Sequence, residues 1–175
     1  EYLRRGMAVT FFAGSIKNAG AGLDGIDLVG LDSARLLDTS PSRAMVQGLH
    51  NQAAYTCLKD WIARNDTGQT AYHLHNWSQI LSPAIFPALE SVASRLVVTC
   101  HDFFNICPNG GFTDFRRSRP CELKPLSLRC LANPCDRRSN LHKYWRVARQ
   151  VHLNRLAAVV RSQAQIAPQT RAQSK

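Results

Sequence analysis

The chain has 175 residues, of which 45% are hydrophobic and 19% are charged. This composition supplies enough apolar material for one globular domain and excludes a disordered or collagen-like chain. The longest apolar runs fall far short of the roughly 18 residues that a membrane span requires, so we expect no transmembrane helix. The formal net charge is +10, from 22 Lys and Arg against 12 Asp and Glu.

The positive charge is concentrated in the second part of the chain. Residues 1–100 carry eight basic and eight acidic side chains, whereas residues 101–175 carry fourteen basic side chains against four acids. We expect this region to attract anions, whether substrate phosphates, an acidic lipid surface or nucleic acid; the alternative is a solvated face without a partner. Six cysteines without a secretory signal favour a reducing, cytoplasmic location.

The first half of the chain predicts two strands and a helix. Residues 7–14 and 26–31 are short runs typical of strands, the first of them buried. Ser40 followed by Pro41 is typical of a helix start. We expect one helix from there to about Arg64, with a buried face formed by Met45, Leu49, Ala53, Cys57 and Trp61.

A strand, helix, strand unit follows. Residues 71–76 and 95–100 have strand patterns, and a helix is expected over about 83–92. Such a crossover joins parallel strands, whose carboxyl ends share the edge of the sheet at which ligands bind. The pairs His75-Asn76 and His101-Asp102 stand at that edge. His73 is expected to alternate away from His75 and to serve packing.

The pair His101-Asp102 has two interpretations. A histidine donates or accepts hydrogen bonds near neutral pH, so it can bind a sugar hydroxyl or transfer a proton. The structural alternative, which the sequence chemistry by itself favours, is a histidine bonded to backbone at a strand end, with Asp102 capping the next turn. The pair His75-Asn76 carries the same two interpretations.

Residues 103–140 show no periodicity, and a loop of this length indicates a segment that is functional or is held together by a bound metal. Its four cysteines lack a C-x-x-C pair, so free buried thiols, a bound metal and disulfides all stay open, favoured in that order; they are Cys107, Cys121, Cys130 and Cys135. The turn Asn109-Gly110-Gly111 lets backbone amides approach a ligand, although an ordinary loop is favoured.

The last predicted helix begins after Ser139, a suitable N-cap. Residues 162–175 form a polar tail without a clear pattern. The helix is expected to bury one apolar side, formed by Leu141, Trp145, Ala148, Val151, Leu156 and Val159.

Several motifs occur in a specific order: HLHNW at 73–77, SPAI at 82–85, VVTCHDFF at 97–104 and CPNGG at 107–111. Cys121, SLRCL at 127–131, Cys135 and HKYWR at 142–146 continue the series. In this order the chain resembles the N-terminal domain of family 4 (group 1) glycosyltransferases over about residues 1–160.

The resemblance implies an α/β fold, a Rossmann-like parallel sheet with flanking helices that forms the N-terminal half of a GT-B architecture. Residues 1–160 would be the acceptor-side domain without its first strand, and 161–175 a tail or the start of a missing segment. The implied activity is transfer of a sugar, with retention of configuration, from a nucleotide sugar to a glycan or lipid-linked acceptor in bacterial polysaccharide or glycoconjugate assembly. No cofactor, catalytic metal or nucleic acid is expected.

The resemblance also assigns roles to individual residues. His101 and Asp102 would be the catalytic residues: His101 would contact the transferred sugar, and Asp102 would support its loop. His75 and Asn76 would line the acceptor side. Substrate binding is further implied for Asn109, Gly110 and Gly111. The basic second half agrees with family members that dock on anionic membrane surfaces, here at the inner face of the cytoplasmic membrane.

The chain departs from the family at both ends. It starts at Glu1, without the glycine-rich first strand, and its only glutamates, Glu1, Glu90 and Glu122, cannot form the E-x7-E motif of the C-terminal domain. We therefore expect a fragment that is inactive without the missing domain, because stabilisation of the leaving phosphate is the largest electrostatic contribution to such a transfer. The rival hypotheses are a basic, Cys-rich metal- or nucleic-acid-binding module and an inert interaction partner.

Overall fold

The computed structural model describes residues 2–14, 23–31 and 39–168, and it is an α/β fold with parallel strand pairing, as predicted. Strand β1 (Val9–Ala13) pairs with β2 (Ile26–Gly30). Strand β4 (Leu96–Cys100) lies between β3 (Tyr72–His75) and β7 (Gln165–Pro168), in parallel with both. Two-residue strands β5 (Thr113–Asp114) and β6 (Arg119–Pro120) pair antiparallel.

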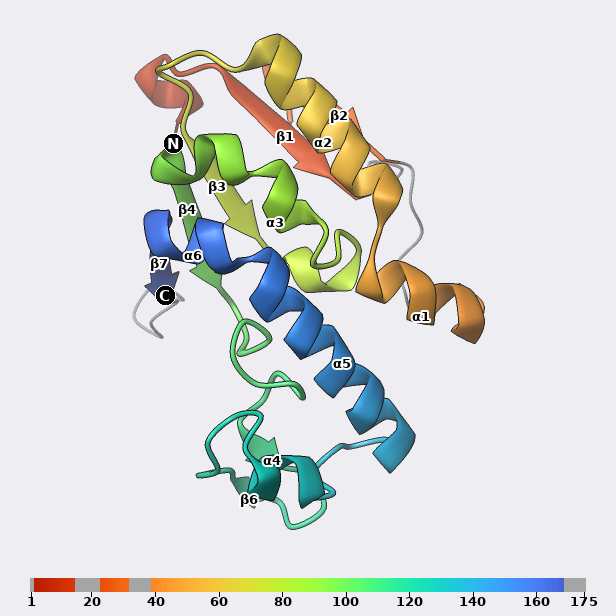
Figure 1. The fold of residues 1–175 in the computed structure, drawn as a ribbon. Coiled ribbons are helices and arrows are strands. Elements are labelled where there is room, and N and C mark those ends of the chain that lie inside the picture. The colour runs from red at the N-terminus through yellow and green to blue at the C-terminus, as the bar shows by residue number, and fades with distance from the viewer. Residues whose placement is uncertain (1, 15–22, 32–38, 169–175) are drawn as a thin grey trace.

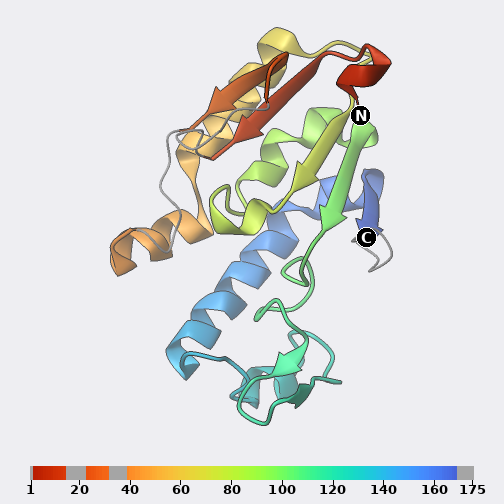
Figure 2. The ribbon, with the colours of Figure 1, turned by 180° about the vertical axis from the view of Figure 1, so that it is seen from behind.

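The helices follow the strands in an order typical of α/β crossovers. Helices α2, α3 and α6 lie on one face of β3 and β4, while the opposite face of these strands is uncovered in the view from behind (Figures 1 and 2). The described helical segments are η1 (Leu3–Arg5), α1 (Pro41–Leu49), α2 (Gln52–Asn65), η3 (Trp77–Gln79), α3 (Ile85–Ala88), η4 (Glu90–Arg95), α4 (Leu128–Ala132), α5 (Asn140–Leu156) and α6 (Ala158–Gln163). Within the part of the chain that the structure describes, none of them is long and apolar enough to cross a bilayer.

The prediction of a single helix from Pro41 to about Arg64 is wrong, because the helix is interrupted at Asn51, which separates α1 from α2. The Asn51 side chain accepts a hydrogen bond from the Ala54 N–H at 3.1 Å and donates one to the Ile80 carbonyl at 2.9 Å, and its own N–H donates to Ser82 Oγ. Asn51 thus caps α2 and ties it to the turn after β3.

The buried face of α2 lies one residue beyond the expected one. Ala54, Leu58 and Ile62 enter the core, whereas the side chain of Met45 in α1 is 48% exposed. The shift follows from the break, since each helix packs independently of the periodicity of the other.

The helix expected over 83–92 is also shorter than predicted. Only Ile85–Ala88 is α-helical, and Glu90–Arg95 forms a tighter 3-10 helix. Pro87 lacks the N–H that an α-helix would use here, which favours short turns over a continuous helix.

The hydrophobic core is formed by the face of β3 and β4 that α2, α3 and α6 cover, and Phe86 and Leu96 are almost fully buried in it. The expectation that β1 is buried is wrong, because Phe11 is 53% exposed and only Phe12 packs against the core cluster.

Helix α5 begins at its predicted cap, since Ser139 Oγ accepts a hydrogen bond from the His142 N–H. The expected buried side is wrong: Leu141, Val151 and Val159 are exposed, and the buried residues of α5 are Lys143, Arg149, Gln150 and Leu153. The physical reason is that α5 packs against loops whose carbonyl groups need donors. Lys143 Nζ, for example, donates to the carbonyls of Cys130 and Asn133.

The segment expected to be a tail contributes to the sheet. Residues 165–168 form β7, with Val98 of β4 opposite Ile166. Residues 169–175 lie outside the described residues. The strand escaped prediction because one short edge strand carries too weak a pattern of its own.

The core position Leu153 and the exposed position Leu141 of α5 provide a matched test. Because Leu153 is 1% exposed and Leu141 is 72% exposed, Leu153→Ala should lower the free energy of unfolding by about 3 kcal/mol. The control Leu141→Ala should change it by less than about 0.5 kcal/mol. Urea unfolding followed by circular dichroism measures both, and equal losses would contradict the observed orientation of α5.

Candidate functional site

The two polar pairs singled out in the sequence lie at one edge of the sheet. Strands β3 and β4 are parallel, and the register places Tyr72 opposite Leu96 and His75 opposite Thr99. His75 is the last residue of β3, and His101 directly follows β4. The prediction that both histidines stand at the carboxyl edge is therefore confirmed.

Three histidines form a cluster, His73, His75 and His101, which we call the histidine cluster. His75 Nδ1 lies 2.9 Å from His101 Nε2, within hydrogen-bond distance, and the two ring centroids are 5.2 Å apart. The rings of His73 and His75 approach more closely, with centroids 3.9 Å apart. The parallel pairing thus brings imidazoles 26 residues apart in sequence into direct contact.

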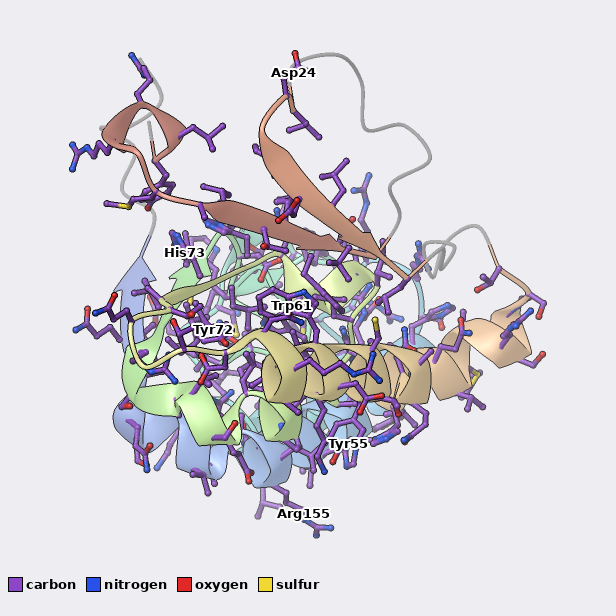
Figure 3. The ribbon with its side chains drawn as sticks, turned by 90° about the horizontal axis from the view of Figure 1, so that it is seen from above. Asp24, Tyr55, Trp61, Tyr72, His73 and Arg155 are labelled. Atoms are coloured by element: carbon purple, nitrogen blue, oxygen red, sulfur yellow. The ribbon has the colours of Figure 1, made fainter. Side chains whose placement is uncertain are left out.

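His73 corrects a sequence expectation. It does not point away from His75, because residues two apart on a strand share a face and the residue between them, Leu74, enters the core. Figure 3 shows His73 and Tyr72 on opposite sides of β3, with Tyr72 towards α2. His73 Nε2 also lies 2.7 Å from Thr99 Oγ1 on β4. Sequence reasoning missed His73 and Thr99, although the two-residue period of a strand was sufficient to find both.

The surroundings of His75 favour its neutral ring. Partial desolvation, followed by the charges that His73 and His101 would carry, lowers the pKa of His75 below its ordinary value. In the bond between His75 and His101 one ring nitrogen donates its proton and the other accepts it, and either tautomer satisfies the geometry. Nε2 of His75 and Nδ1 of His101 do not take part in this bond.

An ion pair fixes the other end of the same two strands. Arg95, next to β4, donates from Nη1 and Nη2 to the Asp66 carboxylate at 2.8 and 2.7 Å, and the Tyr72 hydroxyl of β3 donates to it at 2.8 Å. These hydrogen bonds lower the pKa of Asp66 to about 2, with Arg95 the larger cause. Since Arg95 also donates to the carbonyls of Thr67 and Thr70, it holds the entry of β3 beside that of β4.

The exits of β3 and β4 are joined by side chains as well. Trp77, two residues after His75, donates from its indole N–H to Asn105 Oδ1 at 3.1 Å. The guanidinium of Arg149 stacks on Trp77 and donates to the carbonyls of Gly48 and Ser78. Burial lowers the pKa of Arg149 to about 10, so this side chain remains charged at neutral pH.

Asp102 and Asn76 shape the backbone next to the histidines. Asp102 Oδ1 accepts a hydrogen bond from the Phe104 N–H at 3.0 Å, which confirms that it caps the turn after β4 and is consistent with support of the loop. Asn76 adopts the left-handed region, with φ of 43°, a conformation that asparagine tolerates better than most residues. It turns the chain from β3 into η3.

The turn Asn109-Gly110-Gly111 is explained by packing inside the loop. Asn109 is buried, and its side chain bonds to the Gly111 N–H, the Thr113 carbonyl and two cysteine sulfurs. Gly110 has a φ of 72°, and a Cβ there would lie 2.6 Å from the Phe104 ring. These contacts assign the turn a structural role, and its substrate-binding role stays a prediction.

None of the six cysteines forms a disulfide in the structure. In the arrangement that the structure describes, no three side chains of His, Cys, Asp or Glu are positioned as they stand to hold a metal ion.

Comparison with known proteins finds no protein-family model, no curated protein and no solved structure that matches the chain. A functional assignment therefore depends on the geometry of the sheet edge and on the chemistry of the histidine cluster.

The lowered pKa of His75 predicts an acid-sensitive fold. Below about pH 6.5 the unfolded chain protonates this imidazole while the folded chain resists, so stability should be greatest above that pH and fall as the pH drops. The variant His75→Gln should show a weaker decline. A residual decline is expected from His152, whose pKa is also lowered, mainly by burial.

Thermal unfolding midpoints of both proteins, measured at several values between about pH 8 and pH 5, check this prediction. Identical pH dependence in the two proteins would contradict the lowered pKa of His75.

Proposed function

We propose that this chain is the acceptor-side domain of a retaining glycosyltransferase, which transfers a sugar from a nucleotide sugar to a glycan or lipid-linked acceptor. The observation that carries the proposal is the contact between His75 and His101 at the carboxyl edge of two parallel strands. Ligands of open parallel sheets bind at this edge. The order of the motifs around both histidines, which resembles family 4 glycosyltransferases, supports the same function.

The chemistry of the histidine cluster suits a sugar. Sugar hydroxyls both donate and accept hydrogen bonds, and a neutral imidazole offers one donor and one acceptor. In our proposal His101 contacts a hydroxyl of the transferred sugar, and His75 and Asn76 line the acceptor side. Asp102 acts through the loop that it caps and does not touch the substrate.

The lowered pKa of His75 is useful in such a transfer. Cleavage of a glycosidic bond passes through a transition state with positive charge on the sugar ring. A protonated imidazole next to that ring would repel the developing charge, whereas a neutral imidazole does not. Partial burial, and then the charges that His73 and His101 would carry, lower the pKa of His75 and so favour the neutral form of this imidazole.

The fold proposed for the chain is a Rossmann-like half of a GT-B architecture. Parallel pairing in both β1–β2 and β3–β4–β7 supports it, as do the helices that cover one face of β3 and β4 in Figure 1. We propose that the nucleotide sugar is bound by a second, C-terminal domain of the same enzyme. That domain would supply the basic groups that stabilise the leaving phosphate, so this chain by itself would be inactive.

The basic loop region would bring the enzyme to its acceptor. Six arginines between β5 and α5 are exposed: Arg116, Arg117, Arg119, Arg129, Arg137 and Arg138. Exposed clusters of this kind favour anionic lipid surfaces, by about 1 kcal/mol for each basic residue near the surface. We propose peripheral contact of this loop with the inner face of the cytoplasmic membrane, where lipid-linked acceptors are found.

Replacement of His101 tests the proposal. In an enzyme that contains this chain and its nucleotide-sugar domain, His101→Ala should lower turnover about 100-fold or more, because it removes a hydrogen-bonding group next to the reacting sugar. Transfer of labelled sugar from a panel of nucleotide sugars to lipid and glycan acceptors measures the effect. The control is His50→Ala, since His50 lies at the end of α1, beside Tyr55 and His152.

Circular dichroism of both variants shows whether the fold is retained. Near-normal transfer by a folded His101→Ala variant, or equal losses in the two variants, would remove His101 from its proposed role.

A further inference from the structure

The long loop between β4 and α5 lacks a hydrophobic core of its own. Among the described residues, the core cluster of the domain contains no side chain between Asn105 and His152. Regular structure within 103–139 is limited to β5, β6 and the five-residue helix α4. A segment of this length with so little buried apolar surface requires another source of stability.

Four cysteines of this loop line one small cavity. A cavity of about 10 Å³ is lined by Cys107, Cys121, Cys130 and Cys135, the four cysteines of the loop. Three of them are buried, and Cys121 is partly buried. A space of this size holds one guest no larger than a water molecule. It is therefore too small for a sugar or a nucleotide, but it is suitable for a single ion.

Two of the four thiols contact the same side-chain amide. The Asn109 amide lies between them, since Cys107 Sγ donates to its Oδ1 at 3.2 Å and its Nδ2 donates to Cys135 Sγ at 3.4 Å.

Positive charge surrounds the cavity. Lys143 is buried and lines the cavity together with Arg146. Arg146 Nη1 lies 3.2 Å from Asp136 Oδ2, an atom that is fully buried and receives no hydrogen bond from the described residues. Asp136 pairs with Arg146, and among the described residues no ion pair includes Lys143, so its charge at the cavity is not balanced by a carboxylate.

We propose that Cys107, Cys121, Cys130 and Cys135 bind one zinc ion, which holds the loop together. Each thiol loses its proton to solvent, and four thiolates with Zn²⁺ form a tetrahedral centre with a net charge of about −2. Lys143 and Arg146 offset this charge. The side chains must rotate about their Cα–Cβ bonds to reach zinc–sulfur distances of about 2.3 Å, since they are not positioned for a metal as they stand.

The surroundings favour a metal over disulfides. The carbonyls of Cys130 and Asn133 hold Lys143 in place. An uncharged disulfide would leave the charge of Lys143 unbalanced at the cavity, whereas a zinc–thiolate centre attracts a cation. The zinc centre is structural and takes no part in sugar transfer, and this inference does not depend on the proposed function. Its consequence for that function is indirect, because the loop begins directly after His101 and Asp102.

Metal analysis of the full chain tests the proposal. Protein purified under reducing conditions should contain about one zinc per chain. Cys130→Ser, which removes a buried ligand, should lower the affinity for zinc at least about tenfold. The matched control is Cys57→Ser, because Cys57 lies on α2, outside the cavity; it should retain the metal.

Cobalt substitution identifies the ligands without any variant. Co²⁺ added to metal-free chain should give the intense visible bands of a tetrahedral tetrathiolate site, and the bands should disappear when zinc is added. If Cys130→Ser fails to fold, the cobalt spectrum of the unaltered chain decides whether the four cysteines bind a metal. The proposal is overturned by weak octahedral cobalt bands, by reduced protein without zinc whose six thiols all react with a thiol reagent, or by disulfides among these cysteines in mass spectrometry.

Discussion

The register between β3 and β4 is the constraint on which the candidate site depends. It sets His75 opposite Thr99 and thereby brings His101, the residue that follows β4, within hydrogen-bond distance of His75. A slip of one residue would turn His73 and His75 into the core and expose Leu74. The Asp66–Arg95 ion pair holds the strands at their entry, the end opposite the site.

Helix α5 shows that the net charge of the chain does not indicate which basic side chains are buried and which are exposed to solvent. Lys143 and Arg149 of α5 are buried and donate to carbonyl groups of α1, η3 and the long loop, whereas six arginines of that loop face solvent. Part of the basic excess therefore maintains the fold. Only the exposed part is available for the phosphates or lipid surfaces that a glycosyltransferase of this kind would contact.

The molecule combines a sheet held by hydrophobic packing with a loop held mainly by polar contacts. Asn105 joins these two parts, since it accepts a hydrogen bond from Trp77 and its carbonyl accepts from Gln150 and Arg161. Because the loop leaves the sheet directly after His101, its order and the position of the histidine cluster are connected through Asp102 and Asn105. A zinc ion in the loop would strengthen this connection.

The sequence by itself determined the elements with strong local signals: the strands at 9–13, 26–30, 72–75 and 96–100, and the Ser139 cap of α5. It also placed His75 and His101 at one edge of the sheet, because the strands that such a crossover joins run in parallel. Only the tertiary structure decided which sides of the helices are buried, where the chain breaks at Asn51, how β7 joins the sheet and why Asn109 and Gly110 occupy the loop. These features depend on hydrogen-bond partners and aromatic rings that are distant in sequence, such as Ile80 and Ser82 for Asn51, and local periodicity contains no information about them.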